Sequence, residues 1–127
     1  MSSAVLDASA VLAALNREPG ADRVAEVIER SLLCSVNLAE VVAKLVERGA
    51  SPEQAAMIVG ALGCRVVVLD EALAIRTGTL RHDTRSSGLS LGDRACLALA
   101  EREGLPALTT DRVWKSLELG IDVHVIR

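Results

Sequence analysis

Short hydrophobic segments, rich in leucine or in β-branched residues, alternate along this chain with segments that have helical periodicity. The short segments are Ala4 to Leu6, Leu32 to Ser35, Arg65 to Leu69, Ala107 to Thr109 and Val123 to Ile126. Strands separated by helices pair in parallel, because each crossover helix returns the chain to the edge of the sheet where strands begin. The pattern therefore predicts an α/β fold, a three-layer α/β/α sandwich around a central parallel sheet.

Two local patterns add detail to this prediction. The string Val66 to Leu69 has almost no polar alternation, so we expect this strand to be buried on both faces, as strands are when helices cover a sheet on each side. Ser51, Pro52 and Gln54 predict a helix start, with an N-cap, a proline at the first helical position and a capping-box glutamine.

Composition favours one globular unit. The chain has 127 residues, half of them apolar, and no repeat or linker divides it, so we expect residues 1–127 to form a single domain. No segment reaches the ~20 apolar residues of a membrane span, and no secretory leader is evident, which favours a cytoplasmic protein. Cys34, Cys64 and Cys96 lie far apart in apolar stretches, which indicates free thiols rather than disulfides or a zinc site.

Four carboxylates lie where predicted strands or helices begin or end. They are Asp7, Glu40, Asp93 and Asp111. In an open parallel sheet, ligands bind beyond the carboxyl ends of the strands, so acids in these places are candidates for a shared site. Taken singly, each is also typical of a helix cap or first turn, which is how we interpret Asp70. If the four converge, their repulsion must be offset, and divalent metal ions are the simplest counter-charge.

Such a set suits phosphodiester hydrolysis. Two divalent ions can activate water, polarise the phosphate and stabilise the leaving oxygen, and Mg²⁺ or Mn²⁺ needs only oxygen ligands for this. Small polar neighbours are suited to hydrogen bonds that orient the carboxylates, although they are also ordinary cap and turn residues. These neighbours are Ser9, Asn37, Thr109 and Thr110. The net charge of −3 does not exclude a nucleic-acid partner, because four of the acids would be neutralised by metal ions if they shared one site.

The strings that carry the acids, VLDASAVLAAL, NLAEV, LSLGDRACLALA and LTTDRVW, are similar to those of a known family. The chain resembles PIN-domain ribonucleases, specifically the VapC toxins of bacterial toxin–antitoxin pairs. The resemblance implies endonucleolytic cleavage of RNA with Mg²⁺ or Mn²⁺, up to two ions per site, held by Asp7, Glu40, Asp93 and Asp111. It also implies a homodimer and a small VapB-like antitoxin. One departure is Trp114, which stands where many relatives carry another acid, and this puts the second ion in doubt.

Two other functions remain open. A non-catalytic PIN-like module for RNA binding or assembly would keep this fold without cleaving RNA. It would lack stacking aromatics, because Trp114 is the only one, and would depend on arginines such as Arg17, Arg81, Arg85, Arg94 and Arg112. A phosphoacceptor or phosphatase is disfavoured, because Ser9 stands where such a phosphatase has a second aspartate. No glycine-rich phosphate loop is present, so we expect no nucleotide cofactor.

Overall fold

The predicted strands form one parallel sheet in the structure, a computed structural model that describes residues 1–127. The strands run in the order β3-β2-β1-β4-β5, and every neighbouring pair is parallel. Their bounds are β1 Ala4–Leu6, β2 Ser31–Cys34, β3 Arg65–Val67, β4 Ala107–Thr109 and β5 Val123–Val125. The prediction of a parallel α/β sheet is therefore confirmed, with strand boundaries that shift by two residues or fewer.

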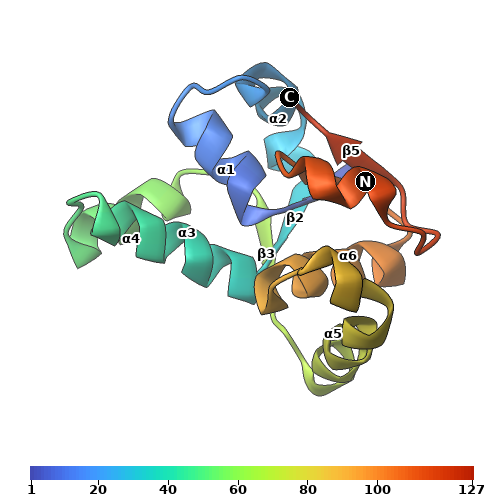
Figure 1. The fold of residues 1–127 in the computed structure, drawn as a ribbon. Helices are drawn as coiled ribbons and strands as arrows, with labels where there is room; N and C mark the ends of the chain where they lie inside the picture. Colours follow the sequence, from blue (N-terminus) through green and yellow to red (C-terminus); the bar gives the residue numbers. More distant parts are fainter.

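Helices connect most of the strands and cover both faces of the sheet (Figure 1). The α-helices are α1 Ala8–Leu15, α2 Ala21–Val27, α3 Ser35–Glu47, α4 Pro52–Gly60, α5 Glu71–Thr84 and α6 Leu91–Glu103. Three short 3-10 segments complete the set: η1 Ile28–Arg30, η2 Arg85–Ser87 and η3 Arg112–Ser116. None of the helices combines the length and the hydropathy needed to cross a bilayer.

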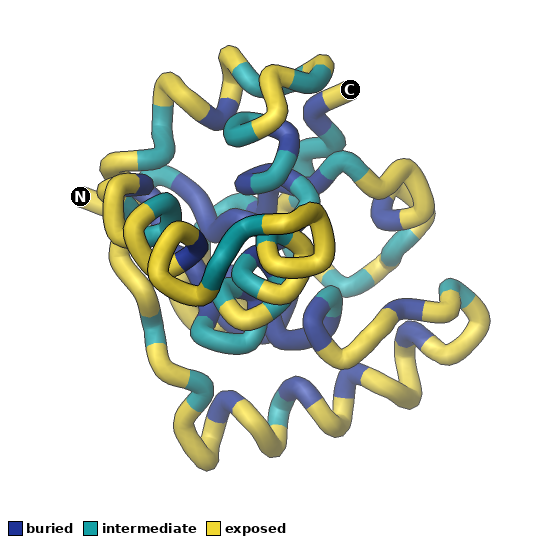
Figure 2. Tube along the Cα trace, turned by 90° about the vertical axis from the view of Figure 1, so that its left-hand side faces the viewer, coloured by how far each residue is buried: buried dark blue, intermediate teal, exposed yellow.

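The alternation of side chains along the strands divides the hydrophobic core into two clusters. Leu6 and Leu33 point to the cluster that includes residues of α1, α2 and α3. Val5 and Leu32 point to the opposite cluster, which includes α6 and part of α5. Figure 2 shows the buried segments gathered at the centre of the molecule, with exposed turns outside them. The sheet therefore lies between two helical layers, as a three-layer sandwich requires.

Strand β3 departs from the sequence prediction. It is an edge strand, paired only with β2, and its side chains are largely exposed: Val66 is 43% and Val68, just beyond the strand, 70% exposed. The expectation that this strand is buried on both faces is therefore wrong. An unbroken apolar string indicates a strand but does not distinguish an edge from the centre of a sheet.

The predicted start of α4 is confirmed in detail. Ser51 accepts a hydrogen bond from the backbone N–H of Gln54, and the Gln54 side chain accepts one from the N–H of Ser51. We expect Ser51→Ala to lower the free energy of unfolding by about 1 kcal/mol, because one N–H of the first turn loses its acceptor. Urea denaturation measures the change. Since α4 contributes nothing to the pocket described below, metal binding should not respond to this substitution.

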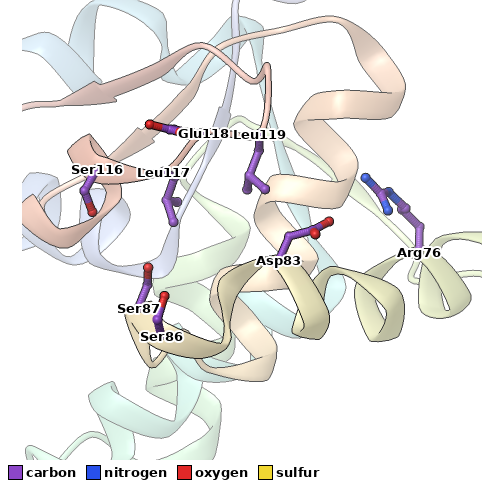
Figure 3. Close-up of a pocket in the computed structure, with 8 residues that line it drawn as sticks. All are labelled: Arg76, Asp83, Ser86, Ser87, Ser116, Leu117, Glu118 and Leu119. Carbon is purple, nitrogen blue, oxygen red and sulfur yellow. The ribbon is translucent and has the colours of Figure 1, made fainter.

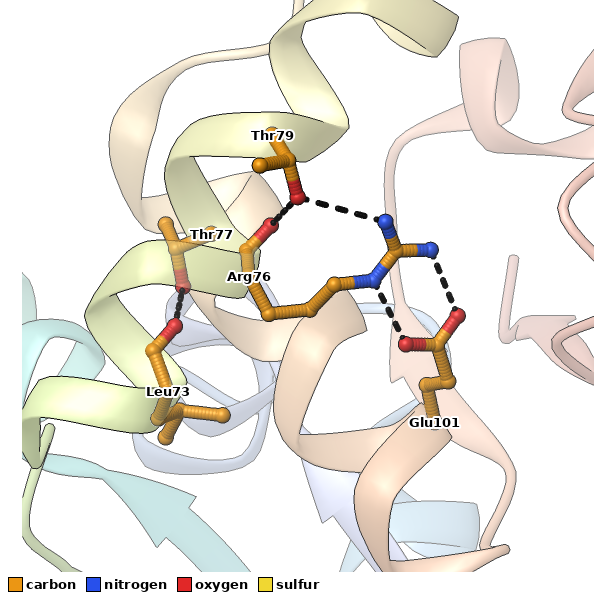
Figure 4. A network of polar contacts seen from close by, with 5 residues as sticks. All are labelled: Leu73, Arg76, Thr77, Thr79 and Glu101. Atoms are coloured by element: carbon orange, nitrogen blue, oxygen red, sulfur yellow. Dashed lines mark hydrogen bonds and ion pairs between the residues drawn. The ribbon is translucent and has the colours of Figure 1, made fainter.

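Helices α5 and α6 lie side by side on one face of the sheet and are joined by polar contacts (Figure 4). Arg76 donates two hydrogen bonds to the Glu101 carboxylate, at 2.7 and 2.9 Å. Arg94 is only 9% exposed and donates to the backbone oxygen of Thr77. The suggestion that Arg94 contacts RNA phosphates is therefore wrong, because its guanidinium is committed to the seam between the two helices.

Candidate functional site

Asp7 lies at the point where the direction of strand addition reverses. The chain adds β2 and β3 on one side of β1, and β4 and β5 on the other. Loops leaving β1 and β4 therefore diverge and open a crevice at the carboxyl end of the sheet, the usual place for a ligand in this kind of fold. Asp7 follows β1 directly and is 4% exposed. It is the most deeply buried acid of the predicted set.

The Asp7 carboxylate is not used as a helix cap. Asp7 occupies the N-cap position of α1, yet its side chain makes no capping hydrogen bond. Instead its Oδ2 accepts hydrogen bonds from the hydroxyls of Ser9, at 2.7 Å, and Thr109, at 2.9 Å. Both bonds go to the same oxygen, so Oδ1 is left without a protein donor. The explanation by local capping therefore fails for Asp7, which is the result expected of a functional carboxylate.

The two hydroxyls are themselves oriented by backbone donors. The Ser9 hydroxyl accepts from the N–H of Thr110 at 3.0 Å, and the Thr109 hydroxyl accepts from the N–H of Asp111 at 3.1 Å. Each hydroxyl oxygen thus receives an N–H and directs its own hydrogen at Asp7. Ser9 and Thr109 therefore both donate to the Asp7 carboxylate. Thr110 contributes through its backbone rather than its side chain.

Glu40 reaches the same region from α3. Its Oε1 accepts a hydrogen bond of 2.9 Å from the side-chain amide of Asn37, one turn earlier in the helix. Asn37 is fully buried, and the same nitrogen donates to the backbone oxygen of Gly92 in α6, at 3.0 Å. Asn37 therefore orients Glu40 and joins α3 to α6. The Oδ1 atom of Asn37 is buried without a partner.

Asp93 lies in the first turn of α6 and belongs to a capping box. Its Oδ2 accepts from the N–H of Ser90 at 2.9 Å, while the Ser90 hydroxyl accepts from the N–H of Asp93. The local explanation holds for one of its two oxygens. Asp7, Glu40 and Asp93 nevertheless line a common pocket of about 360 Å³. The structure thus brings together three of the four predicted acids, from the end of β1, from α3 and from α6.

Asp111 is placed differently. It is exposed, caps η3 by accepting a 3.0 Å hydrogen bond from the N–H of Val113, and does not line that pocket. Its backbone N–H, not its carboxylate, is linked to Asp7: the N–H donates to the Thr109 hydroxyl, which in turn donates to Asp7. Asp70 has the purely structural role that we assigned to it, since it caps α5 and pairs with Arg102.

The electrostatics of the pocket are those of crowded, partly dehydrated carboxylates. Burial raises the pKa of the Asp7 carboxyl from 3.8 to about 6, with repulsion from Asp93 and Glu40 acting in the same direction and the hydroxyls of Ser9 and Thr109 acting against it. Burial, and then repulsion from Asp93, also raises the pKa of Glu40, against the hydrogen bond from Asn37. With three carboxylates against the single Lys44, the lining of the pocket carries more acidic than basic groups.

The ligand atoms that these residues offer are carboxylate oxygens, the type that a hard divalent cation prefers. The titratable residues that line the pocket are the three carboxylates and Lys44, with no thiol or imidazole, and oxygen donors are what Mg²⁺ and Mn²⁺ prefer. As they stand, no three Asp, Glu, His or Cys side chains are close enough to form a metal cluster. Asp93 and Asp111 are instead both engaged by capping N–H groups.

A second cavity, of about 470 Å³, lies where α5 and η2 face the segment that follows η3 (Figure 3). Two of its polar side chains are engaged: Arg76 binds Glu101, and the Ser116 hydroxyl donates to the backbone oxygen of Val113. None of the four predicted acids lines it. This cavity is therefore distinct from the carboxylate pocket.

Fold and pocket together define a class of protein: an α/β domain that gathers carboxylates where strand order reverses at the carboxyl edge of a parallel sheet. The sequence profile of the PIN domain matches residues 4–118. Because this match spans most of the sequence, the chain belongs to the PIN domain family. No curated protein sequence matches the chain.

Solved structures of the same fold include VapBC complexes and a VapC toxin. The DNA-bound VapBC of Salmonella typhimurium is 22% identical, with a TM-score of 0.75 over 98% of each chain. A toxin–antitoxin complex of Klebsiella pneumoniae is 19% identical, with a TM-score of 0.74 over 99% of this chain and 98% of that one. VapC20 of Mycobacterium tuberculosis, named as a toxin that cleaves the sarcin–ricin loop, is 20% identical, with a TM-score of 0.74 over 94% of this chain and 99% of its own. At these identities the likeness establishes the fold.

Proposed function

We propose that this protein is an endoribonuclease that hydrolyses RNA phosphodiester bonds with Mg²⁺ or Mn²⁺, as the toxin of a VapBC-type pair. The observation that carries the proposal is the meeting of Asp7, Glu40 and Asp93, from three separate elements, in one pocket. Membership of the PIN family supports the reaction class. The solved relative named for cleaving the sarcin–ricin loop supports RNA as the substrate.

The residues of this chain would act by holding and orienting. Asp7, Glu40 and Asp93 are the proposed ligands, with Asp111 joining them once its carboxylate leaves the N–H of Val113. When bound, one or two divalent ions would activate the attacking water and stabilise the charge on the phosphate. Ser9 and Thr109 fix the Asp7 carboxylate through Oδ2 and leave Oδ1 for a ligand. The low dielectric around the buried Asp7 strengthens its attraction for a cation.

Trp114 supports the inference that a second ion is held weakly. Its side chain is 1% exposed and packs in the core on the α6 side of the sheet. It supplies no oxygen ligand at the position where many relatives carry an acid. We infer that the second ion depends on fewer protein ligands and is recruited with the RNA phosphate.

The proposed partners are a small VapB-like antitoxin and a second copy of the chain. The solved relatives from Salmonella typhimurium and Klebsiella pneumoniae are toxin–antitoxin complexes, which supports an antitoxin here. Several large apolar side chains are exposed and are available for contacts in such assemblies. They include Met57, Val68, Ile75 and Leu91.

Cleavage of RNA by the purified protein tests the proposal. We expect fragments from total RNA with Mn²⁺ or Mg²⁺ and none with a chelator. We expect Asp93→Asn to lower the rate at least about 100-fold, because disturbing even an outer partner of a metal ligand costs 10- to 100-fold. The asparagine can still accept the capping hydrogen bond from Ser90, so circular dichroism should show a folded protein.

The matched control is Asp70→Asn, since Asp70 also follows a strand and caps a helix but lies outside the pocket. It should cleave RNA at the wild-type rate. A non-catalytic RNA-binding module is the second candidate, favoured by the capping bonds that already engage Asp93 and Asp111. That module would bind RNA in the presence of Mn²⁺ without cutting it, and such a result would replace the nuclease proposal.

A further inference from the structure

Gly92 is an unexpected residue in its position. It is the second residue of α6, where glycine is disfavoured because it loses more backbone freedom on folding than other residues. Its backbone is ordinary helix and does not have the positive φ that would require glycine. A glycine in the first turn of a helix was the available signal in the sequence, but it does not say what fills the space.

The Glu40 carboxylate occupies that space. A Cβ built on Gly92 would overlap Cδ and both carboxylate oxygens of Glu40, and these are the nearest atoms to it. The neighbouring residue on α6 is Asp93, so the absence of a side chain lets Glu40 lie against the helix beside a second acid. Asn37 holds this arrangement from the other side, because one amide nitrogen donates to both Glu40 and the oxygen of Gly92.

We propose that Gly92 is a positioning residue: the missing side chain admits the Glu40 carboxylate to the first turn of α6 and so sets the cation affinity of the pocket. This inference rests on the proposed metal site but concerns a residue that contributes no ligand atom. Stability and positioning are separable here. The atoms that an added Cβ meets belong to the far end of a flexible side chain, so Glu40 can swing aside without disturbing the backbone.

The test is Gly92→Ala, with Gly78→Ala as the matched control. Gly78 lies inside α5, and a Cβ added there meets nothing within 4 Å. Both variants should be at least as stable as the wild type, because alanine is the better helix former. Only Gly92→Ala should displace Glu40. We expect its Mn²⁺ affinity to fall about 10- to 100-fold, the usual loss when a ligand loses its orientation.

The NMR signals of the Asn37 side-chain amide report the position of Glu40 without any metal, because this amide donates to Glu40. The side-chain amides of the chain are those of Asn16, Asn37 and Gln54, so a ¹⁵N–¹H spectrum contains three such pairs. In Gly92→Ala the Asn37 pair should shift and exchange faster with solvent, because it loses one acceptor. The other two pairs should stay in place, and Gly78→Ala should move none of the three.

Adding Glu40→Asp to Gly92→Ala tests whether a shorter acid recovers the lost Mn²⁺ affinity. A side chain shorter by one methylene clears the new Cβ, so Glu40→Asp should restore part of the Mn²⁺ affinity in Gly92→Ala while weakening binding in the wild-type background.

Should Gly92→Ala have a lower melting temperature than the wild type, adding Glu40→Ala must restore its stability. If Glu40→Ala fails to restore the stability, or if the Asn37 side-chain amide signals do not shift in Gly92→Ala, the proposed role of Gly92 is wrong. A wild type that binds no Mn²⁺ and cuts no RNA overturns the proposed function, while the Asn37 signal still decides where Glu40 lies.

Discussion

Asp7→Asn is expected to remove RNA cleavage while making the metal-free protein more stable. The loss of activity should be at least about 100-fold, because the central proposed ligand loses its charge. The gain in stability follows from burial. At neutral pH the folded state holds a dehydrated carboxylate beside two others, and asparagine presents the same shape without the charge. Urea denaturation and a cleavage assay on one preparation measure both effects.

The gain in stability should depend on pH in a defined direction. The pKa of Asp7 is about 6 in the folded protein, against 3.8 for an ordinary aspartate, which represents the unfolded chain. Below 3.8 both states are protonated, and Asp7 costs nothing. As the pH rises toward 6, the unfolded chain ionises first, so the wild type loses stability relative to Asp7→Asn. Above pH 6 the full difference, about 3 kcal/mol, should be present.

Asp70→Asn is the control, and we expect it to change the free energy of unfolding in the opposite direction. The backbone N–H of Leu73, and then Arg102, hold the pKa of Asp70 below its usual value. Its charge therefore stabilises the fold at neutral pH. Removing that charge should destabilise the protein above about pH 4, and the loss of stability should shrink as the pH falls further. If Asp7→Asn lowered stability at pH 7.5 as Asp70→Asn does, Asp7 would be an ordinary structural carboxylate, and the metal site would lose its central member.

Local signals account for the parts of the structure that the sequence predicted well. The capping box at Ser51 and the positions of β1 and β4 depend on residues close together in the chain. Asp7 stood out as a candidate because it directly follows a predicted strand, and in a parallel sheet such positions lie at the edge where ligands bind. The edge position of β3 was not, since Val66 to Leu69 would read the same in a central strand.

Contacts between distant segments account for what the sequence did not reveal. Arg94 looks like any helix-surface cation until α5 supplies the Thr77 carbonyl that buries it. Glu40 looks like a carboxylate among apolar neighbours, and only the fold places it against Gly92. Asp111 shows the reverse case, because its carboxylate makes a local capping bond instead of joining the other acids. The outcomes for Arg94 and Glu40 depend on tertiary packing that no periodicity encodes.

Mn²⁺ or Mg²⁺ is expected to raise the melting temperature of the wild type by roughly 10 °C at a hundredfold excess over Kd. Binding to the folded state alone supplies about 2.7 kcal/mol at that excess, and each kcal/mol shifts Tm by several degrees in a chain of this size. Trp114 is the only aromatic residue and lies buried in η3, which Asp111 caps, so its fluorescence reports unfolding without interference.

The shift in Tm should also depend on pH, because the ion must displace a proton from Asp7 wherever that carboxyl is protonated. The pKa of about 6 predicts a full shift at pH 7.5 and a smaller one at pH 5. Asp7→Asn should start from a higher Tm and respond little to either ion, whereas Ser51→Ala should start lower and respond as the wild type does. An equal shift in wild type and Asp7→Asn would place the bound ion outside this pocket, and the excess negative charge around Asp7 would then need another explanation.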